Sequence, residues 1–186
     1  MSTAYQNIHQ PIIDRCLLGE RQAQYEIYQL YAKAMFNSAY RITRNDQDAE
    51  DVLQDSFVSA FKNLKSYKGT AAFGSWLKRI VVNNAINLVK KRRLQFESVE
   101  DSPDVDALTN EVEDADMSYE VDMVKEGISK LPEGYRLVIT LYLLDGFDHK
   151  EIASVLEITE STSKSQYNRA KKRLREILKN ELKYAG

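Results

Sequence analysis

The sequence predicts an all-α protein: two small helical domains joined by a flexible acidic linker. Its 186 residues contain only seven glycines and three prolines, whereas the helix-favouring residues Ala, Leu, Lys and Glu are common. Apolar residues recur at spacings of three and four along most of the chain, which is the period of an amphipathic helix. We place the domains at residues 1–95 and 119–186, and the linker at residues 96–118.

Charge is distributed unevenly along the chain. The formal net charge is −2, but residues 97–122 contain eleven acidic residues and neither Lys nor Arg. These acids account for −11, so the rest of the chain carries +9. The acidic stretch has few large apolar side chains, which predicts a flexible linker. The basic remainder is expected to bind polyanions.

Several classes of protein are excluded by composition. Cys16 is the only cysteine, so neither an intramolecular disulfide nor a multi-cysteine zinc site is possible. There is no run of about 18 apolar residues and no signal-peptide core, which predicts a cytoplasmic protein without direct membrane insertion. His9 and His149 are far apart in the sequence, and no catalytic constellation is evident. We therefore expect no enzyme activity, cofactor, metal or small-molecule substrate.

The first domain begins with two helices in residues 10–44, joined near Gly19, and continues with an amphipathic helix at residues 46–64 that Asn45 or Asp46 can cap. The face opposite the apolar residues of this third helix, with its edge, carries Asp48, Asp51, Gln54, Asp55 and Val58. A solvated surface is the default interpretation of such a face. The more specific alternative is a docking surface for a partner that bears arginines.

A loop at residues 65–73, interrupted by Gly69, precedes a helix at residues 76–93 with an apolar packing surface. The polar and aromatic residues of interest in this segment are Tyr67, Lys68, Thr70, Trp76, Lys78, Arg79, Asn83, Asn84, Asn87, Lys90 and Lys91. Aromatic rings stack on bases, amides read exposed base edges and cations hold phosphates, so this combination suits a melted DNA strand. The alternative is that Trp76 is simply a core residue.

The second domain is predicted as a four-helix module, with a helical pair at residues 119–145 and a helix-turn-helix at residues 148–178. In the last helix, one face gathers Ser163, Tyr167, Ala170, Leu174, Ile177 and Leu178. The opposite face and its flanks carry Ser161, Lys164, Ser165, Asn168, Arg169, Lys172 and Arg175. Hydroxyls, an amide and cations on one exposed face suit the DNA major groove.

The turn of this motif has two features of its own. Thr159 is a natural N-cap for the second helix. Glu157 occupies a position where glycine would fit a left-handed helix end, and a side chain there costs about 1 kcal/mol. Either the turn avoids this conformation or the motif absorbs the strain.

Taken together, three segments resemble bacterial sigma factors of the extracytoplasmic-function (ECF) type, over residues 10–180. DAEDVLQDSFVSAFKNL resembles the helix that docks on RNA polymerase, and FGSWLKRIVVNNAINLVKKRR resembles the segment that opens and reads the −10 element. LPEGYRLVITLYLLDGFDHKEIASVLEITESTSKSQYNRAKKRLREIL is similar to the −35-reading domain. The implied partners are core RNA polymerase, promoter DNA (double-stranded at −35, melted at −10) and an anti-sigma factor.

The resemblance also implies a role for individual residues. The polymerase clamp helices would face Asp48, Asp51, Gln54, Asp55 and Val58. The melted −10 element would contact Tyr67, Lys68, Gly69, Thr70, Trp76, Lys78, Arg79, Asn83, Asn84, Asn87, Lys90 and Lys91. The −35 element would contact Ser161, Thr162, Lys164, Ser165, Gln166, Asn168, Arg169, Lys172 and Arg173. The chain departs from the commonest family pattern at Val82, Asn87, Ser163 and Gln166, which leaves its promoter sequence open.

A homodimeric helix-turn-helix regulator is the main alternative. It accounts for residues 148–178 but not for the basic, asparagine-bearing helix at residues 76–93. Such a regulator would bind a palindromic duplex without polymerase. A sigma factor would open promoters only in complex with the polymerase.

Overall fold

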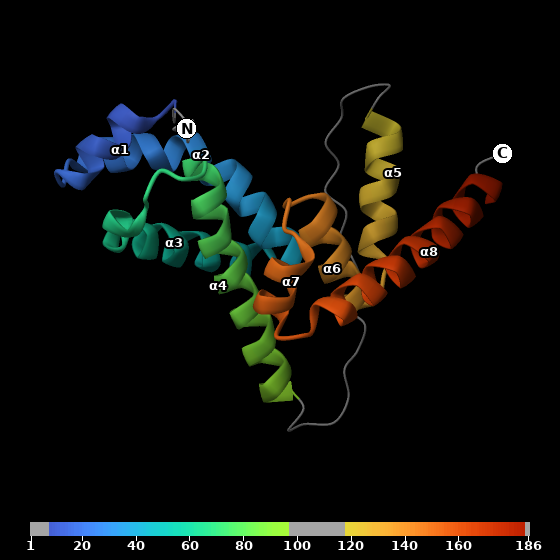
Figure 1. Cartoon of the computed structure of the whole chain (residues 1–186). Coiled ribbons are helices and arrows are strands. Elements are labelled where there is room, and N and C mark those ends of the chain that lie inside the picture. Colours follow the sequence, from blue (N-terminus) through green and yellow to red (C-terminus); the bar gives the residue numbers. More distant parts are fainter. Residues whose placement is uncertain (1–7, 97–117, 185–186) are drawn as a thin grey trace, which may run out of the picture. The chain divides into compact units, whose positions relative to one another are not determined.

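The computed structural model describes the backbone of residues 8–96 and 118–184, and the side chains of residues 8–92 and 121–180. Every regular element in these ranges is helical, which confirms the all-α prediction (Figure 1). The chain divides into two compact units between residues 101 and 102. Apart from its two end positions, the predicted linker at residues 96–118 lies outside the described residues. No helix within the described ranges combines the length and hydropathy needed to cross a lipid bilayer.

The first unit is a set of helices around one apolar core. Its elements are α1 (Gln10–Leu17), α2 (Arg21–Thr43), α3 (Asp46–Lys62), the 3-10 turn η1 (Leu64–Ser66) and α4 (Phe73–Phe96). α2 packs against α1, α3 and α4, and α3 also packs against α4. Ile27, Ile42, Phe73 and Leu77 are fully buried in the core. Burial of each such side chain contributes about 1.5–3 kcal/mol, which stabilises the packing of α2 and α4 in this core.

The junctions of this unit follow local backbone chemistry. Gly19, with φ +85°, lies in the predicted joint between α1 and α2. Arg44, the residue that follows α2, adopts a left-handed conformation. Asn45 then caps α3, because its side-chain oxygen accepts a hydrogen bond of 3.0 Å from the backbone N–H of Asp48. Of the two predicted caps, the structure therefore uses Asn45.

The second unit is the predicted four-helix module. Its elements are α5 (Ser118–Ser129), α6 (Glu133–Leu143), α7 (His149–Leu156) and α8 (Glu160–Tyr184). α8 packs against each of the other three helices. A buried cluster joins α5 and α6 to α8 through Ile128, Leu131, Ile139, Ala170 and Leu174. The inward face predicted for the last helix is confirmed, since these α8 residues are buried, with Tyr167, Ile177 and Leu178 packed against the cluster.

The turn between α7 and α8 adopts the strained conformation. Glu157 has φ +56° and ψ 43°, which is the left-handed region, and its backbone N–H bonds to the carbonyl of Ala153. Of the two possibilities that the sequence left open, the motif therefore absorbs the strain. The turn is three residues long, so that α8 begins at Glu160.

Candidate nucleic-acid interface

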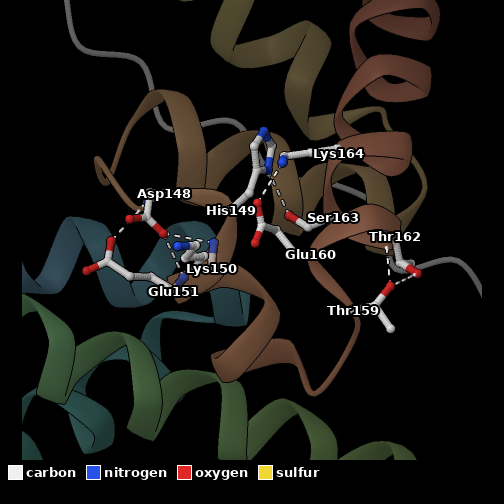
Figure 2. Close-up of polar contacts among 9 residues, drawn as sticks. All are labelled: Asp148, His149, Lys150, Glu151, Thr159, Glu160, Thr162, Ser163 and Lys164. Carbon is white, nitrogen blue, oxygen red and sulfur yellow. Dashed lines mark hydrogen bonds and ion pairs between the residues drawn. The ribbon is translucent and has the colours of Figure 1, made fainter.

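The helix-turn-helix is built on well-formed helix caps (Figure 2). Asp148 caps α7, because its Oδ1 accepts from the backbone N–H groups of Lys150 and Glu151, both at 2.8 Å. The carboxylate of Glu151 in turn accepts from the backbone N–H of Asp148 at 2.9 Å, which completes a capping box. The predicted cap of α8 is also formed, since Oγ1 of Thr159 accepts from the backbone N–H of Thr162 at 3.0 Å. The N-termini of both helices of the motif are thus fixed by short polar contacts.

α8 exposes most of the residues predicted to read the −35 element. The exposed members of this set are Ser161, Lys164, Ser165, Asn168, Arg169, Lys172 and Arg173, and the half-buried members are Thr162 and Gln166. Ser163, between them, is completely buried. A single exposed face therefore carries amide, hydroxyl and cationic groups, which matches the donors and acceptors of a major groove.

Two of the α8 cations already have acidic partners on the same helix. Nζ of Lys164 lies 2.6 Å from Oε1 of Glu160 (Figure 2), and Arg173 lies 3.0 Å from Glu176. The hydrogen bond from Lys164 lowers the pKa of the Glu160 carboxyl. Exposed pairs of this kind contribute at most about 1 kcal/mol. A phosphate can therefore compete for both cations at a small cost.

In the first unit, the loop before α4 is held by an aromatic cluster. The ring of Tyr67 lies 5.3 Å from that of Phe73 and 5.4 Å from that of Trp76. Its hydroxyl donates to the carbonyl of Ala71 at 2.7 Å, which closes the loop around Gly69. Gly69 has φ +68°, a conformation that a Cβ disfavours. Trp76 is half-buried, so it contributes to the core and still keeps part of its ring accessible.

Beyond the loop, α4 presents a polar stripe. Arg79, Asn83, Asn87 and Lys91 are all exposed and recur every four residues, so they share one side of the helix. Of the remaining predicted contacts, Lys68 and Thr70 are exposed, whereas Lys78, Asn84 and Lys90 are half-buried. The structure thus places the predicted −10 residues in the loop and on α4, where four of them form the exposed stripe.

Asn84 is partly committed within the protein. Its Nδ2 donates to Oγ of Ser56 at 3.0 Å, and Ser56 is completely buried on α3. The sequence did not predict this bond. Asn84 is therefore fixed relative to α3, while its amide oxygen and its second N–H are not used by this bond.

The acidic face of α3 differs from its prediction at one residue. Asp51, Gln54, Asp55 and Val58 are exposed. Asp48 is only 6% exposed and is paired with Arg92 of α4. The placement of Asp48 on the exposed side was therefore wrong, because α4 covers this end of α3. Val52 and Ser56, which follow Asp48 at intervals of four, are also buried. The apolar side chain of Val52 was the feature of the sequence that could have indicated that this side of α3 faces the core.

A groove runs between α3 and α4. It has a volume of about 510 Å³. Its walls include the carboxylates of Asp51 and Asp55 from α3, and the polar groups of Asn84, Asn87 and Lys91 from α4. No group of three or more His, Cys, Asp or Glu side chains within the described residues is arranged to hold a metal ion.

These features define a class of protein: a two-unit helical DNA-binding protein with a helix-turn-helix in its second unit. Models of protein families give the same division. The family Sigma-70 region 2 matches residues 27–95, in the first unit. The family Sigma-70, region 4 matches residues 122–174, in the second.

Whole-chain comparisons extend this result. The ECF RNA polymerase sigma-E factor of Haemophilus influenzae is 31% identical, over 96% of this chain and 97% of its own length. The ECF RNA polymerase sigma factor SigW of Bacillus subtilis is 29% identical, over 87% of this chain and 92% of its own. This chain therefore belongs to the ECF RNA polymerase sigma factors.

Solved structures agree on the fold. The sigma factor RpoE of Bartonella quintana, in complex with the anti-sigma factor NepR, matches with a TM-score of 0.60 and 23% identity. This match covers 83% of the present chain and 96% of the other. CnrH, in complex with the cytosolic domain of CnrY, matches with a TM-score of 0.55 and 24% identity, over 91% and 96% of the two chains.

Proposed function

We propose that this chain is a transcription initiation factor that binds core RNA polymerase, directs it to −35 and −10 promoter elements, and helps to melt the −10 region. The observation that carries the proposal is the exposure, on α8 and α4, of amides and cations within the two sigma-70 segments. In this role the chain acts in the cytoplasm, without a cofactor and without catalysis of its own.

The second unit reads duplex DNA. Gln166 and Asn168 carry the amides that can form bidentate hydrogen bonds with adenine in the major groove. Arg169 and Lys172 are exposed, and neither forms an ion pair with a residue that the structure describes. They are suited to hold the phosphates beside those bases, which fixes register without reading sequence.

The first unit holds the separated strand. Base stacking on an aromatic side chain contributes about 1–3 kcal/mol per base, and unstacking a base costs a few kcal/mol. Tyr67 and the accessible part of Trp76 provide such rings, while Arg79 and Lys91 lie on the exposed stripe of α4. The gain on the single strand is thus of the size needed to offset opening of the duplex.

The exposed side of α3 docks on the polymerase. Asp51 and Asp55 offer two carboxylates one turn apart, with the 51%-exposed side chain of Val58 beside them. A helix bearing arginines fits this surface, because carboxylates bind guanidinium groups bidentately. Asp48 supports the surface through its contact with α4.

An anti-sigma factor is a further proposed partner. The sigma factor RpoE of Bartonella quintana was solved in complex with the anti-sigma factor NepR, and its fold matches this chain. We extend this type of partnership to the present chain. Its expected effect is to compete with the polymerase for the sigma factor, which would keep the two DNA-facing surfaces inactive until the complex dissociates.

In vitro transcription with core polymerase and a promoter library tests the proposal. We expect initiation only when the chain and the polymerase are both present, at templates that share −35 and −10 sequences. Failure to initiate at any template would contradict it.

Two substitutions in α8 then test its orientation. Lys172→Ala should weaken binding about equally across sequences and reduce the salt slope by about 1. Gln166→Ala should change preference at one −35 position, by about 1–3 kcal/mol for a bidentate contact. Identical behaviour of the two variants would show that the assignment of the DNA-facing side is wrong.

A further inference from the structure

A buried hydroxyl lies under the DNA-facing end of α8. Ser163 has no exposed surface, and its Oγ lies 2.9 Å from Nδ1 of His149 on α7 (Figure 2). The remaining inward residues of α8 that the structure describes as buried are the apolar Ala170 and Leu174. Buried polar groups require a partner, and His149 supplies it from the neighbouring helix.

The position of this contact along α8 gives it a specific mechanical effect. The apolar cluster of the second unit contacts α8 at Tyr167 and beyond. The residues predicted to contact DNA begin at Ser161, so the first turns of the DNA-facing segment precede the cluster. The His149–Ser163 contact lies within those first turns and links them to α7.

His149 is itself held from several directions. It is the first residue of α7, directly after the capping box of Asp148 and Glu151. The ring of Tyr142 on α6 stacks on its imidazole at 4.7 Å, with an interplanar angle of 21°. The ring of Tyr167 on α8 lies 5.6 Å away, at 65°. The capped backbone and the two neighbouring rings hold the plane of the imidazole, with Nδ1 beside Oγ of Ser163.

We infer that His149 and Ser163 form a positioning pair that sets the rotation of the DNA-facing end of α8, so that both control −35 recognition without touching DNA. Apolar contacts tolerate small rotations, whereas a hydrogen bond is directional. A rotation of about 20° moves atoms 5–6 Å from a helix axis by about 2 Å. Such a shift exceeds the range of hydrogen-bond lengths, which is about 0.5 Å. The inference rests on the proposed function, because it assigns the pair to −35 reading.

Three substitutions separate the hydrogen bond from the ring packing. His149→Phe keeps a stacked ring and removes the partner of Ser163. His149→Asn removes the ring but places an amide where Nδ1 stands, so Ser163 keeps a partner. Ser163→Ala removes the hydroxyl and leaves the ring in place.

The assay uses the full chain with core polymerase and two templates that share a −10 element, one with the −35 element and one with that element scrambled. We expect His149→Phe and Ser163→Ala to lower the ratio of initiation on the two templates by roughly 10-fold, the loss of one bidentate base contact. His149→Asn should retain most of the wild-type ratio. Circular dichroism of each variant shows whether the second unit is folded, so that a lower ratio in a folded variant reports on recognition and not on unfolding.

The outcomes are distinguishable from failure of the proposed function. If the wild-type chain initiates on neither template, the proposed function is wrong. If the wild-type chain discriminates between them, and His149→Phe discriminates equally well, the positioning pair is refuted. An equal loss in His149→Asn and His149→Phe would also refute it, because the ring rather than the hydrogen bond would then be responsible.

Discussion

Replacing Asp48 with Asn tests whether this residue holds α3 against α4. Nη2 of Arg92 donates to Oδ1 of Asp48 at 2.6 Å, and Nη1 of the same guanidinium contacts Oδ2. The side chain of Asp48 is 8% exposed and that of Arg92 is 46% exposed. Breaking a fully buried pair costs about 3–5 kcal/mol, whereas an exposed pair contributes at most about 1 kcal/mol. With one partner buried and the other half-exposed, we expect a loss of about 2 kcal/mol.

Urea unfolding followed by tryptophan fluorescence measures this loss. Trp76 is the only tryptophan of the chain, so its emission reports on the unit that contains the pair. Asp51→Asn is the matched control: it makes the same chemical change on the same helix, but Asp51 is exposed. Surface substitutions of this kind change stability by less than about 0.5 kcal/mol. Equal effects of the Asp48 and Asp51 substitutions would refute the assignment of Asp48 to the interior.

The second unit provides three further predictions. Glu157→Gly should raise the free energy of unfolding of this unit by about 0.5 kcal/mol, because the relief of left-handed strain outweighs the entropic cost of ordering a glycine. A lower unfolding temperature, measured by circular dichroism, would contradict this. Glu160→Gln should free Lys164 and steepen the salt dependence of DNA binding by up to about 1; an unchanged slope would count against it. Burial, with a smaller effect of Tyr142, raises the pKa of Tyr167. The neutral Tyr167 phenol therefore contributes stability below pH 10, and this contribution is lost as the pH rises through the pKa of Tyr167 in the folded protein. In urea unfolding above pH 10, the Tyr167→Phe variant should lose less stability than the wild type. Equal losses would refute this.

Local geometry made much of the candidate site predictable. A helix has a fixed period, so the sequence alone places Ser163 and Leu174 on one side of α8 and Ser161 and Lys172 on the other. Caps also depend on neighbouring residues only, which is why Thr159 was identified. For the same reason, the helices and the exposed stripe of α8 follow from the sequence.

Contacts between helices were not predictable in this way. Asp48 and Arg92 are 44 residues apart in the sequence, and nothing local indicates that α4 covers the first turn of α3. Ser56 and Asn84 are 28 residues apart, and their bond likewise depends on how the two helices cross. Val82 and Ile86 are buried as well, although the packing surface predicted for residues 76–93 comprised Trp76, Leu77, Ile80, Val81, Ala85 and Leu88. A helix that packs between several neighbours buries more of its circumference, and a helical wheel contains no information about those neighbours.

In both units, a buried serine forms a bond that involves the helix predicted to face DNA. In the first unit, Ser56 of α3 accepts from Asn84 of α4. In the second, Ser163 of α8 contacts His149 of α7. Apolar burial supplies most of the free energy in each case, but it is non-directional. A bond to a fully buried hydroxyl is directional and therefore favours one rotation of the helix, because a different rotation breaks this bond. Replacing these serines should therefore affect the accuracy of DNA recognition more than it affects the stability of the protein.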